Sequence, residues 1–334
     1  MTIDAYAHIG FPRFGTPDEL IDIWQQWDVH GGCIALPPGM PDFRGLDRAR
    51  KRLGERVRLF GIPYGNDPAS RRELAEFQVR FGVSGMRLMP NEVLENPDVL
   101  AVLGEAGLCL MAINVYESSR LTRSVLDWLE RYPNGTIAAP HFLRPAAIDG
   151  DACSPGVADP GAFRDLLRHP RMHAIFSRHG GVSSRPYPHD DLYPWVEDVV
   201  PLLTWERVLW GSELPVVYHR DEQVDGARDW LKRLGVPMGE AEEAAYLGGN
   251  AARLFFASPP PTPDDVSVPA WVESGIRDFI EANEPVPVVR TGPLQLPLDL
   301  HGKLMSRYIV RQFDHPELSF QEWLAGELRR RIDP

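Results

Sequence analysis

A carboxylate placed directly after an apolar run is the first candidate for chemistry in this sequence. The stretch Arg207-Val208-Leu209-Trp210-Gly211-Ser212-Glu213-Leu214-Pro215 contains apolar residues typical of a buried parallel strand, followed by small residues that let the backbone turn outward. Glu213 then falls just past the strand, and Pro215 prevents the strand from continuing. A carboxylate there is either a solvated loop acid or a general base or metal ligand, and this stretch alone favours the loop acid.

The chain begins with a second group of polar side chains at strand spacing. Asp4, Tyr6 and His8 alternate with apolar residues, so on a strand we expect all three to project from one face. Together the two stretches resemble the ends of the amidohydrolase superfamily, specifically its amidohydrolase 2 branch, which includes lactonases and non-oxidative decarboxylases. That branch opens with Asp-x-His-x-His and closes with Trp-Gly-Ser-Asp-x-Pro. Here Tyr6 replaces the first histidine and Glu213 replaces the closing aspartate.

The resemblance implies a (β/α)8 TIM barrel, whose active site lies at the carboxyl ends of its strands. The sequence itself alternates strand-like and helix-like segments, which predicts a parallel sheet. The eight strand-like runs are Ile3–Ile9, Gly32–Leu36, Val57–Ile62, Val83–Met89, Leu108–Val115, Thr136–Pro140, Met172–Arg178 and Val208–Gly211.

Polar residues that lie in or follow these runs supply the candidate site. Arg87 lies in Gly85-Met86-Arg87, which resembles the Gly-x-Arg of lactonase-like relatives, where the arginine binds a substrate carboxylate or carbonyl; an ordinary ion pair is the alternative. His141 resembles the family histidine that binds metal or polarises the substrate carbonyl, whereas His179 departs from the family's Lys-x-Ser-Gly. We predict catalytic roles for Glu213, His141, His8, Tyr6 and His179, and substrate contacts for Arg87, Tyr64, Asn114, Tyr116, Arg144 and Tyr187.

The resemblance leaves a metal site open. His8, His141 and Glu213 are the candidate ligands that remain, and two histidines with a carboxylate can bind one divalent ion such as zinc or manganese. Tyr6 stands where a ligand histidine is expected, and a phenol with a pKa of about 10 is a poor ligand near neutral pH. We therefore predict catalysis without a cofactor, with a single divalent metal as the alternative.

Three functions are compatible with these residues. The first is a small-molecule hydrolase in which Glu213 is the general base and His8, His141 and Arg87 polarise an ester, lactone or amide carbonyl. In this reading burial tunes the pKa of Glu213 upward, toward neutrality. The second is a metal-dependent non-oxidative decarboxylase. The third is a catalytically degenerate barrel that serves as a binding or scaffold protein.

The helical pattern continues beyond the barrel. Helical spacing of apolar residues predicts helices over Pro17–Val29, Leu121–Arg131, Asp190–Leu203, Asp221–Leu234 and Glu240–Phe256. We assign residues 1–257 to the barrel, 258–269 to a proline-rich linker and 270–334 to a mostly helical C-terminal extension. Its aromatic and apolar residues predict that the extension packs on the protein, through a homodimer interface or on the outer wall rather than as a lid over the active site.

Composition narrows the class of protein. The formal net charge of −12 and the absence of a basic block argue against nucleic acid as a partner, and no run approaches the ~20 apolar residues of a membrane span. Three cysteines and no signal-like start favour reduced thiols and a cytoplasmic location. The expected partner is a small-molecule substrate.

Overall fold

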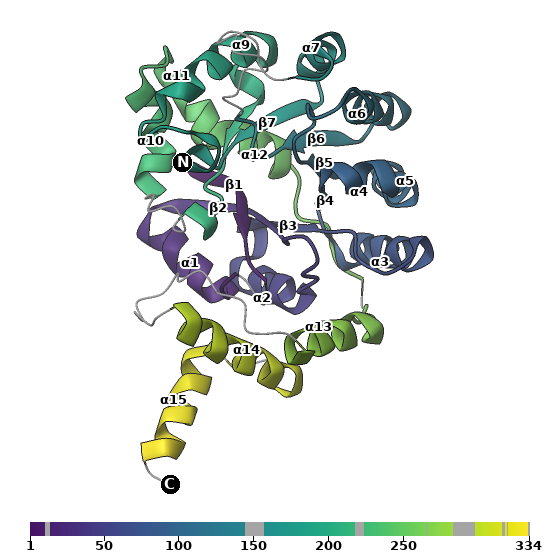
Figure 1. Ribbon diagram of the computed structural model, residues 1–334, viewed down its shortest axis with the longest axis vertical. Coiled ribbons are helices and arrows are strands. Elements are labelled where there is room, and N and C mark those ends of the chain that lie inside the picture. Colours follow the sequence, from purple (N-terminus) through teal and green to yellow (C-terminus); the bar gives the residue numbers. More distant parts are fainter. Residues whose placement is uncertain are drawn as a thin grey trace.

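Eight parallel strands follow one another in order around a barrel, with helices on the outside (Figure 1). The computed structural model describes residues 1–10, 14–143, 157–217, 224–264, 266–282, 298–315, 318 and 320–332. The strands are β1 (Thr2–His8), β2 (Val29–Ala35), β3 (Val57–Gly61), β4 (Gly85–Leu88), β5 (Cys109–Ala112), β6 (Thr136–Ala139), β7 (Met172–Phe176) and β8 (Val208–Trp210). Each of the eight predicted runs overlaps one of these strands, so the TIM barrel is confirmed.

The strands read as continuous apolar runs because both of their faces are covered. One buried cluster fills the barrel, and its members from the strands include Ile3, Ala5, Tyr6, Cys33, Ala35, Phe60, Cys109, Met111, Ala138, Ile175 and Leu209. A second, larger cluster lies between the strands and the surrounding helices. The barrel interior is therefore a packed core, and any chemistry has to take place at its ends.

The first and last strands are joined by the residues that matter most for the site. The backbone N–H of Glu213 donates to Tyr6 O at 2.8 Å, and that of His8 donates to Leu214 O at 2.6 Å. These bonds bring the loop after β8 against the end of β1. The nearly closed barrel thus holds the two stretches singled out in the sequence next to each other.

Helices of the outer layer alternate with the strands, and side-chain caps fix several of their starts. Thr16 and Glu19 form a capping box at α1, and Asp42, Asp67, Ser118 and Asp159 cap α2, α3, α6 and α7. The outer helices are α1 (Pro17–Gln26), α2 (Phe43–Leu53), α3 (Pro68–Phe81), α5 (Pro97–Glu105), α6 (Ser119–Arg131), α7 (Pro160–Arg168), α9 (Tyr193–Leu203) and α10 (Val224–Leu234). Shorter elements are α4 (Pro90–Glu95), α8 (His179–Val182) and the 3₁₀ turns η1 (Gly54–Arg56), η2 (Asp190–Leu192) and η3 (Trp205–Arg207).

The predicted helix Glu240–Phe256 is divided in the structure. It consists of α11 (Glu240–Ala244), a π-helical turn η5 (Ala245–Gly249) and α12 (Asn250–Phe255). A Cβ on Gly248 would lie 2.4 Å from Met1 O, so this turn passes directly against the start of the chain. Phe255 of α12 packs on Phe60 with ring centroids 5.5 Å apart and covers the amino-terminal end of the barrel.

Three helices form the C-terminal extension: α13 (Ala270–Ala282), α14 (Leu298–Asp314) and α15 (Phe320–Ile332). Five of their side chains make a small core of their own, namely Met305, Tyr308, Ile309, Phe320 and Trp323. The prediction that the extension packs on the protein is confirmed by this core and by contacts with the barrel described below. The proline-rich segment between α13 and α14 lies outside the described residues.

Candidate active site

Left-handed backbone marks the ends of four consecutive strands. Asn114, His141 and Arg178 each lie two residues past β5, β6 and β7, with φ of 48°, 55° and 65°, and Glu213 follows β8 with φ of 55°. A residue with a Cβ pays roughly 1–2 kcal/mol for this conformation, and such strain concentrates at functional sites. The strained residues therefore indicate the carboxyl end of β5 to β8 as the place to look for chemistry.

A buried acid with two basic neighbours lies at this end. Oε1 of Glu213 is 2.8 Å from Nε2 of His141 and 3.7 Å from Nη1 of Arg178. The His141 contact is a close ion-pair distance rather than a well-directed hydrogen bond. Ser177, also buried, fixes the loop by accepting a hydrogen bond from the backbone of His141 at 3.0 Å. The prediction that Glu213 and His141 meet is correct.

The protonation of this group differs from the sequence-based expectation. Burial on its own would raise the pKa of Glu213, but the charge and contact of His141, then Arg178 and His8, outweigh it and lower that pKa to about 2. Burial lowers the pKa of His141 below its usual 6.5, even though Glu213 acts in the opposite direction. The expectation of a Glu213 pKa tuned toward neutrality is wrong, because basic partners on neighbouring strands override burial. Near neutral pH Glu213 is a carboxylate and His141 is neutral.

Tyr6 and Arg87 form a second buried pair. Nε of Arg87 donates to the Tyr6 hydroxyl at 2.6 Å, while Nη1 of Arg87 is buried with no hydrogen-bond partner among the described residues. Burial raises the pKa of Tyr6 to about 12, so its hydroxyl keeps its proton and can donate it onward. The Tyr6 ring lies edge-on to both His8 and His141, with centroids 4.6 Å and 5.3 Å away. Two hydrogen-bond donors are thus available next to the Glu213 group.

His8 has a defined tautomer. Its Nδ1 is 2.7 Å from the carbonyl oxygen of Ala35, and a carbonyl requires a donor, so Nδ1 carries the proton. Burial, with the charge of Arg87, lowers the pKa of His8 to about 3, which leaves Nε2 as a hydrogen-bond acceptor at neutral pH. The predicted role of His8 in polarising a carbonyl therefore does not fit this tautomer, whereas holding a water molecule does.

Asp4 does not share the face of Tyr6 and His8. The pairing of β1 with β2 shifts between Asp4 and Ala7, and this irregularity breaks the strict alternation of side chains. Asp4 instead accepts hydrogen bonds from the backbone of Tyr6 and Ser212, from the Ser212 hydroxyl, and from Nε1 of Trp24 on α1. The expectation that it projects into the site is wrong, and Asp4 ties β1 to the loop after β8.

The other predicted residues lie around this centre rather than in it. His179 is buried against the Trp230 ring, with centroids 4.5 Å apart, and burial lowers its pKa to about 3. Tyr116 belongs to a ring cluster with Phe142 and Trp195. The remaining side chains are Asn114, which donates to Glu117; Tyr187, which is 45% exposed; Tyr64, which stacks on Trp271; and Arg144, which lies outside the described residues.

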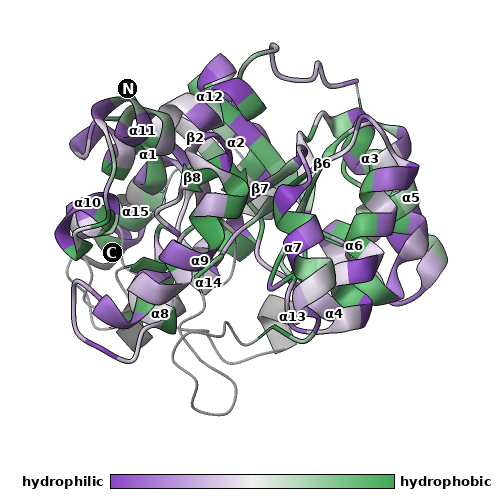
Figure 2. Ribbon diagram, turned by 90° about the horizontal axis from the view of Figure 1, so that it is seen from above, coloured by the Kyte–Doolittle hydropathy of each residue, from purple (hydrophilic) through white to green (hydrophobic). Residues whose placement is uncertain are grey.

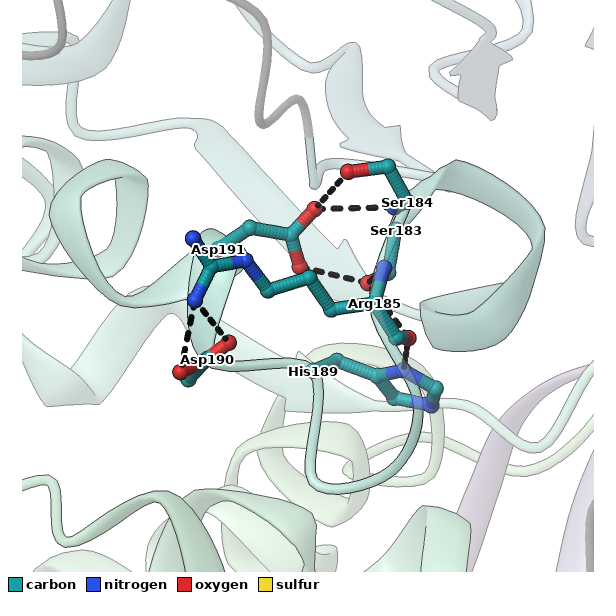
Figure 3. Close-up of polar contacts among 6 residues, drawn as sticks. All are labelled: Ser183, Ser184, Arg185, His189, Asp190 and Asp191. Carbon is teal, nitrogen blue, oxygen red and sulfur yellow. Dashed lines mark hydrogen bonds and ion pairs between the residues drawn. The ribbon is translucent and has the colours of Figure 1, made fainter.

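The loop between β7 and α9 is held by its own polar side chains (Figure 3). Asp191 accepts hydrogen bonds from the hydroxyl of Ser183 and from the backbone N–H of Ser184. Arg185 pairs with Asp190 at 3.1 Å, and its carbonyl oxygen lies 2.9 Å from Nδ1 of His189. These contacts give this loop, which follows Arg178 and His179, a fixed shape.

Sequence reasoning missed Arg178 as a site residue. Its position two residues past β7 matches that of His141 past β6, and this offset is the signal that could have identified it. Its side chain is 37% exposed while that of Glu213 is 4% exposed, so Arg178 reaches from the solvent side toward the buried carboxylate. It is therefore the group of the cluster best placed to meet an incoming molecule.

The donor atoms do not match a metal-binding set. His141 and Glu213 are directed at each other, and Tyr6 is a neutral phenol. Across the part of the chain that the structure describes, no group of three or more His, Cys, Asp or Glu side chains is arranged to hold a metal ion. No step is therefore routed through a metal below, and the absence of a cofactor stays a prediction.

Comparison with known proteins fits this geometry. The sequence profile described as amidohydrolase matches residues 44–257, well over half of the chain. The chain belongs to this amidohydrolase family. No curated protein sequence gives a significant match.

Three solved structures share the fold of this amidohydrolase. A probable 2-pyrone-4,6-dicarboxylic acid hydrolase from Acinetobacter baumannii with citric acid bound has a TM-score of 0.58 at 16% identity, and the match covers 76% of this chain and 98% of that one. An amidohydrolase from Burkholderia multivorans with bound zinc has a TM-score of 0.57 at 16% identity, over the same shares. A putative 2-pyrone-4,6-dicarboxylic acid hydrolase from Pseudomonas putida has a TM-score of 0.56 at 20% identity, over 77% and 98%.

These neighbours are matched almost completely, so about a quarter of this chain has no counterpart in them. The family match ends at residue 257, where the linker begins. Within the described residues, no helix has the length and apolar character needed to cross a membrane.

Proposed function

We propose that this amidohydrolase is a small-molecule hydrolase that cleaves the carbonyl bond of a lactone, ester or amide. The observation that carries the proposal is the opposition of two buried pairs. Glu213 and His141 supply a carboxylate with an imidazole beside it, and Tyr6 and Arg87 supply hydrogen-bond donors that are not used up inside the protein. Acyl hydrolysis needs these two functions, a proton acceptor for water and donors for the oxyanion.

The reaction assigns one role to each group. A water molecule donates one hydrogen bond to Glu213 and the other to Nε2 of His8, then attacks the carbonyl carbon as its proton passes to the carboxylate. The carbonyl electrons move to oxygen, which receives hydrogen bonds from Tyr6 and Arg87. When the tetrahedral intermediate collapses, the bond to the leaving oxygen or nitrogen breaks and Glu213 returns the proton to it. The products are a carboxylic acid and an alcohol or amine.

Arg178 makes an anionic substrate the best fit. A carboxylate with a pKa of about 2 is a weak base, and Arg178 at 3.7 Å is one of the groups that lowers this pKa. A negatively charged substrate that pairs with the partly exposed Arg178 would draw its charge from Glu213 and so make Glu213 more basic. Two solved neighbours are named as hydrolases of a pyrone dicarboxylic acid, which supports an anionic lactone as the first substrate to try.

The test is a hydrolysis screen of lactones, esters and amides, each with and without a carboxylate group. We expect turnover of a carboxylate-bearing lactone, and a loss of at least about 10² in kcat for Glu213→Gln, since a general base contributes about 10²–10⁴. Glu76→Gln, which changes an exposed carboxylate on α3, is the matched control and should keep full activity. No turnover of any member, or equal rates for Glu213→Gln and the unaltered protein, would refute the proposal.

A further inference from the structure

The C-terminal extension reaches the end of the barrel where the candidate site lies. Its linker starts at the opposite end, where Arg58 near the start of β3 donates to the carbonyl oxygens of Phe255 and Ser258 at 2.7 Å each. The linker then passes the end of α3, where the backbone of Asp264 donates to Arg80 O at 2.8 Å. Val266 and Val268 continue along a cleft of about 760 Å³ beside α2. The linker thus crosses the outside of the barrel from base to mouth.

Helix α13 is docked on the loops that follow β2 and β3. Glu273 of α13 pairs with Nε of Arg44, at the start of α2, at 2.8 Å. The Trp271 ring lies parallel to that of Tyr64, three residues past β3, with centroids 6.0 Å apart and planes inclined by 4°. Figure 2 shows α13 at the same end of the molecule as α4 and α8, which directly follow β4 and β7, with α12 at the opposite end. The expected outer-wall placement is therefore wrong for α13.

The fit between Tyr64 and α13 is close. A Cβ on Gly275 would lie 2.9 Å from the Tyr64 hydroxyl, so the tyrosine ring extends along the helix from Trp271 to Gly275. Both rings remain partly exposed. Parallel stacking leaves the outer faces and edges of the two rings available, and aromatic surfaces of this kind favour planar partners.

We propose that Trp271, together with Tyr64, forms an aromatic wall at the entrance of the active site that selects substrates with a planar, ring-bearing group. On this fold, substrate choice is made by the segments after the strands, and α13 adds a segment that has no counterpart in the solved neighbours. The inference rests on the proposed hydrolase function for its kinetic readout, and it goes further by naming a specificity determinant and the substrate class that it takes.

The experiment compares two six-membered lactones, dihydrocoumarin with its fused ring and δ-valerolactone without one. In the full chain, Trp271→Ala should raise KM for dihydrocoumarin about tenfold, in line with the loss of one aromatic pair, and leave KM for δ-valerolactone and both kcat values unchanged. Ser274→Ala, on the exposed side of α13, is the matched control and should change neither lactone. Gly275→Ala, which keeps both rings but displaces Tyr64, should also reduce the preference for dihydrocoumarin.

A binding measurement separates this inference from the hydrolase proposal. Calorimetry of dihydrocoumarin on the Glu213→Gln protein, with and without Trp271→Ala, needs no turnover. If neither lactone is hydrolysed but binding still depends on Trp271, the hydrolase proposal fails and the aromatic wall stands. If Trp271→Ala changes both lactones equally or neither, the aromatic wall is refuted whatever the rates, and so it is if binding to Glu213→Gln is indifferent to Trp271.

Discussion

His141 and Glu213 approach to 2.8 Å at the ends of β6 and β8, and this contact sets the protonation of the site. With Arg178 it holds the pKa of Glu213 at about 2, so the acid is ionised throughout the physiological range. His141 and His8 have lowered pKa values and are neutral there. The site therefore presents one carboxylate, two neutral imidazoles and the Arg87–Tyr6 donors at neutral pH.

The first prediction is the pH dependence of kcat/KM. A histidine whose pKa is lowered keeps its neutral form above its usual value and loses it only as the pH falls through the lowered value. We therefore expect kcat/KM to be flat above pH 6.5 and to fall on the acid side as His141 is protonated, well before Glu213 titrates. Tyr6, with a pKa of about 12, gives no alkaline limb in the accessible range. Initial rates in constant-ionic-strength buffers test this, and an acid limb centred above pH 7 would contradict the assignment.

The second prediction concerns the Tyr6 hydroxyl. Tyr6→Phe removes the donor but keeps the ring that packs on His8 and His141, so the fold should survive. Loss of one oxyanion donor costs about 10²–10³ in kcat, and KM should change little because the bond forms mainly in the transition state. Steady-state kinetics on Tyr6→Phe and on the control Tyr132→Phe, remote from the site on the outer helices, measure this. A raised KM with kcat intact would show that Tyr6 only binds substrate.

The eight strands were predictable because each is an apolar run closed by turn residues, and every predicted run overlaps a strand. The meeting of Glu213 with His141 followed from the order of the strands. The direction of Asp4 did not, since a shift in pairing between β1 and β2 leaves no mark in the sequence. Likewise the left-handed backbone of Arg178 and His141 occurs without the glycines that usually signal it.

The pKa of Glu213 was out of reach for a related reason. Burial is a local property that an apolar run indicates, but the three groups that outweigh it, His141, Arg178 and His8, come from other strands. The extension shows the same division. Its amphipathic helices could be predicted, whereas their docking site depends on single contacts such as Arg44 with Glu273.

The third prediction tests the structural role of Asp4. Its carboxylate accepts four hydrogen bonds, from the backbone of Tyr6 and Ser212, the Ser212 hydroxyl and Trp24. Asp4→Asn supplies one oxygen in place of two, so buried donors lose their partners, and the free energy of unfolding should fall by about 2–4 kcal/mol. Urea unfolding measures this, with exposed Asp127→Asn as a control that should be neutral. Activity per folded molecule should be retained; its loss would place Asp4 in the chemistry.

The fourth prediction is a homodimer through α15. Figure 1 shows this helix extending away from the barrel, and its Leu328 is 52% exposed next to the exposed Arg329 and Arg330. A basic, partly apolar helix on a chain of net charge −12 complements a second copy of that chain. Light scattering should give twice the chain mass of 37.6 kDa, and Leu328→Asp should shift the protein to the monomer. A monomer at every accessible concentration would contradict the prediction.

The last prediction is that activity needs no bound metal. Tyr6 replaces the first ligand histidine of the family pattern, and its phenol keeps its proton up to a pKa of about 12. His141 and Glu213 are already paired, so binding a metal would require that pair to separate. Elemental analysis should therefore find less than one transition metal per chain, and chelators should leave turnover unchanged. Tyr6→His restores the ligand and should raise zinc affinity, which calorimetry can compare with the unaltered chain. Stoichiometric zinc or manganese bound by His8 and His141 in the unaltered protein would overturn the metal-free reaction and favour a metal-dependent hydrolase or decarboxylase.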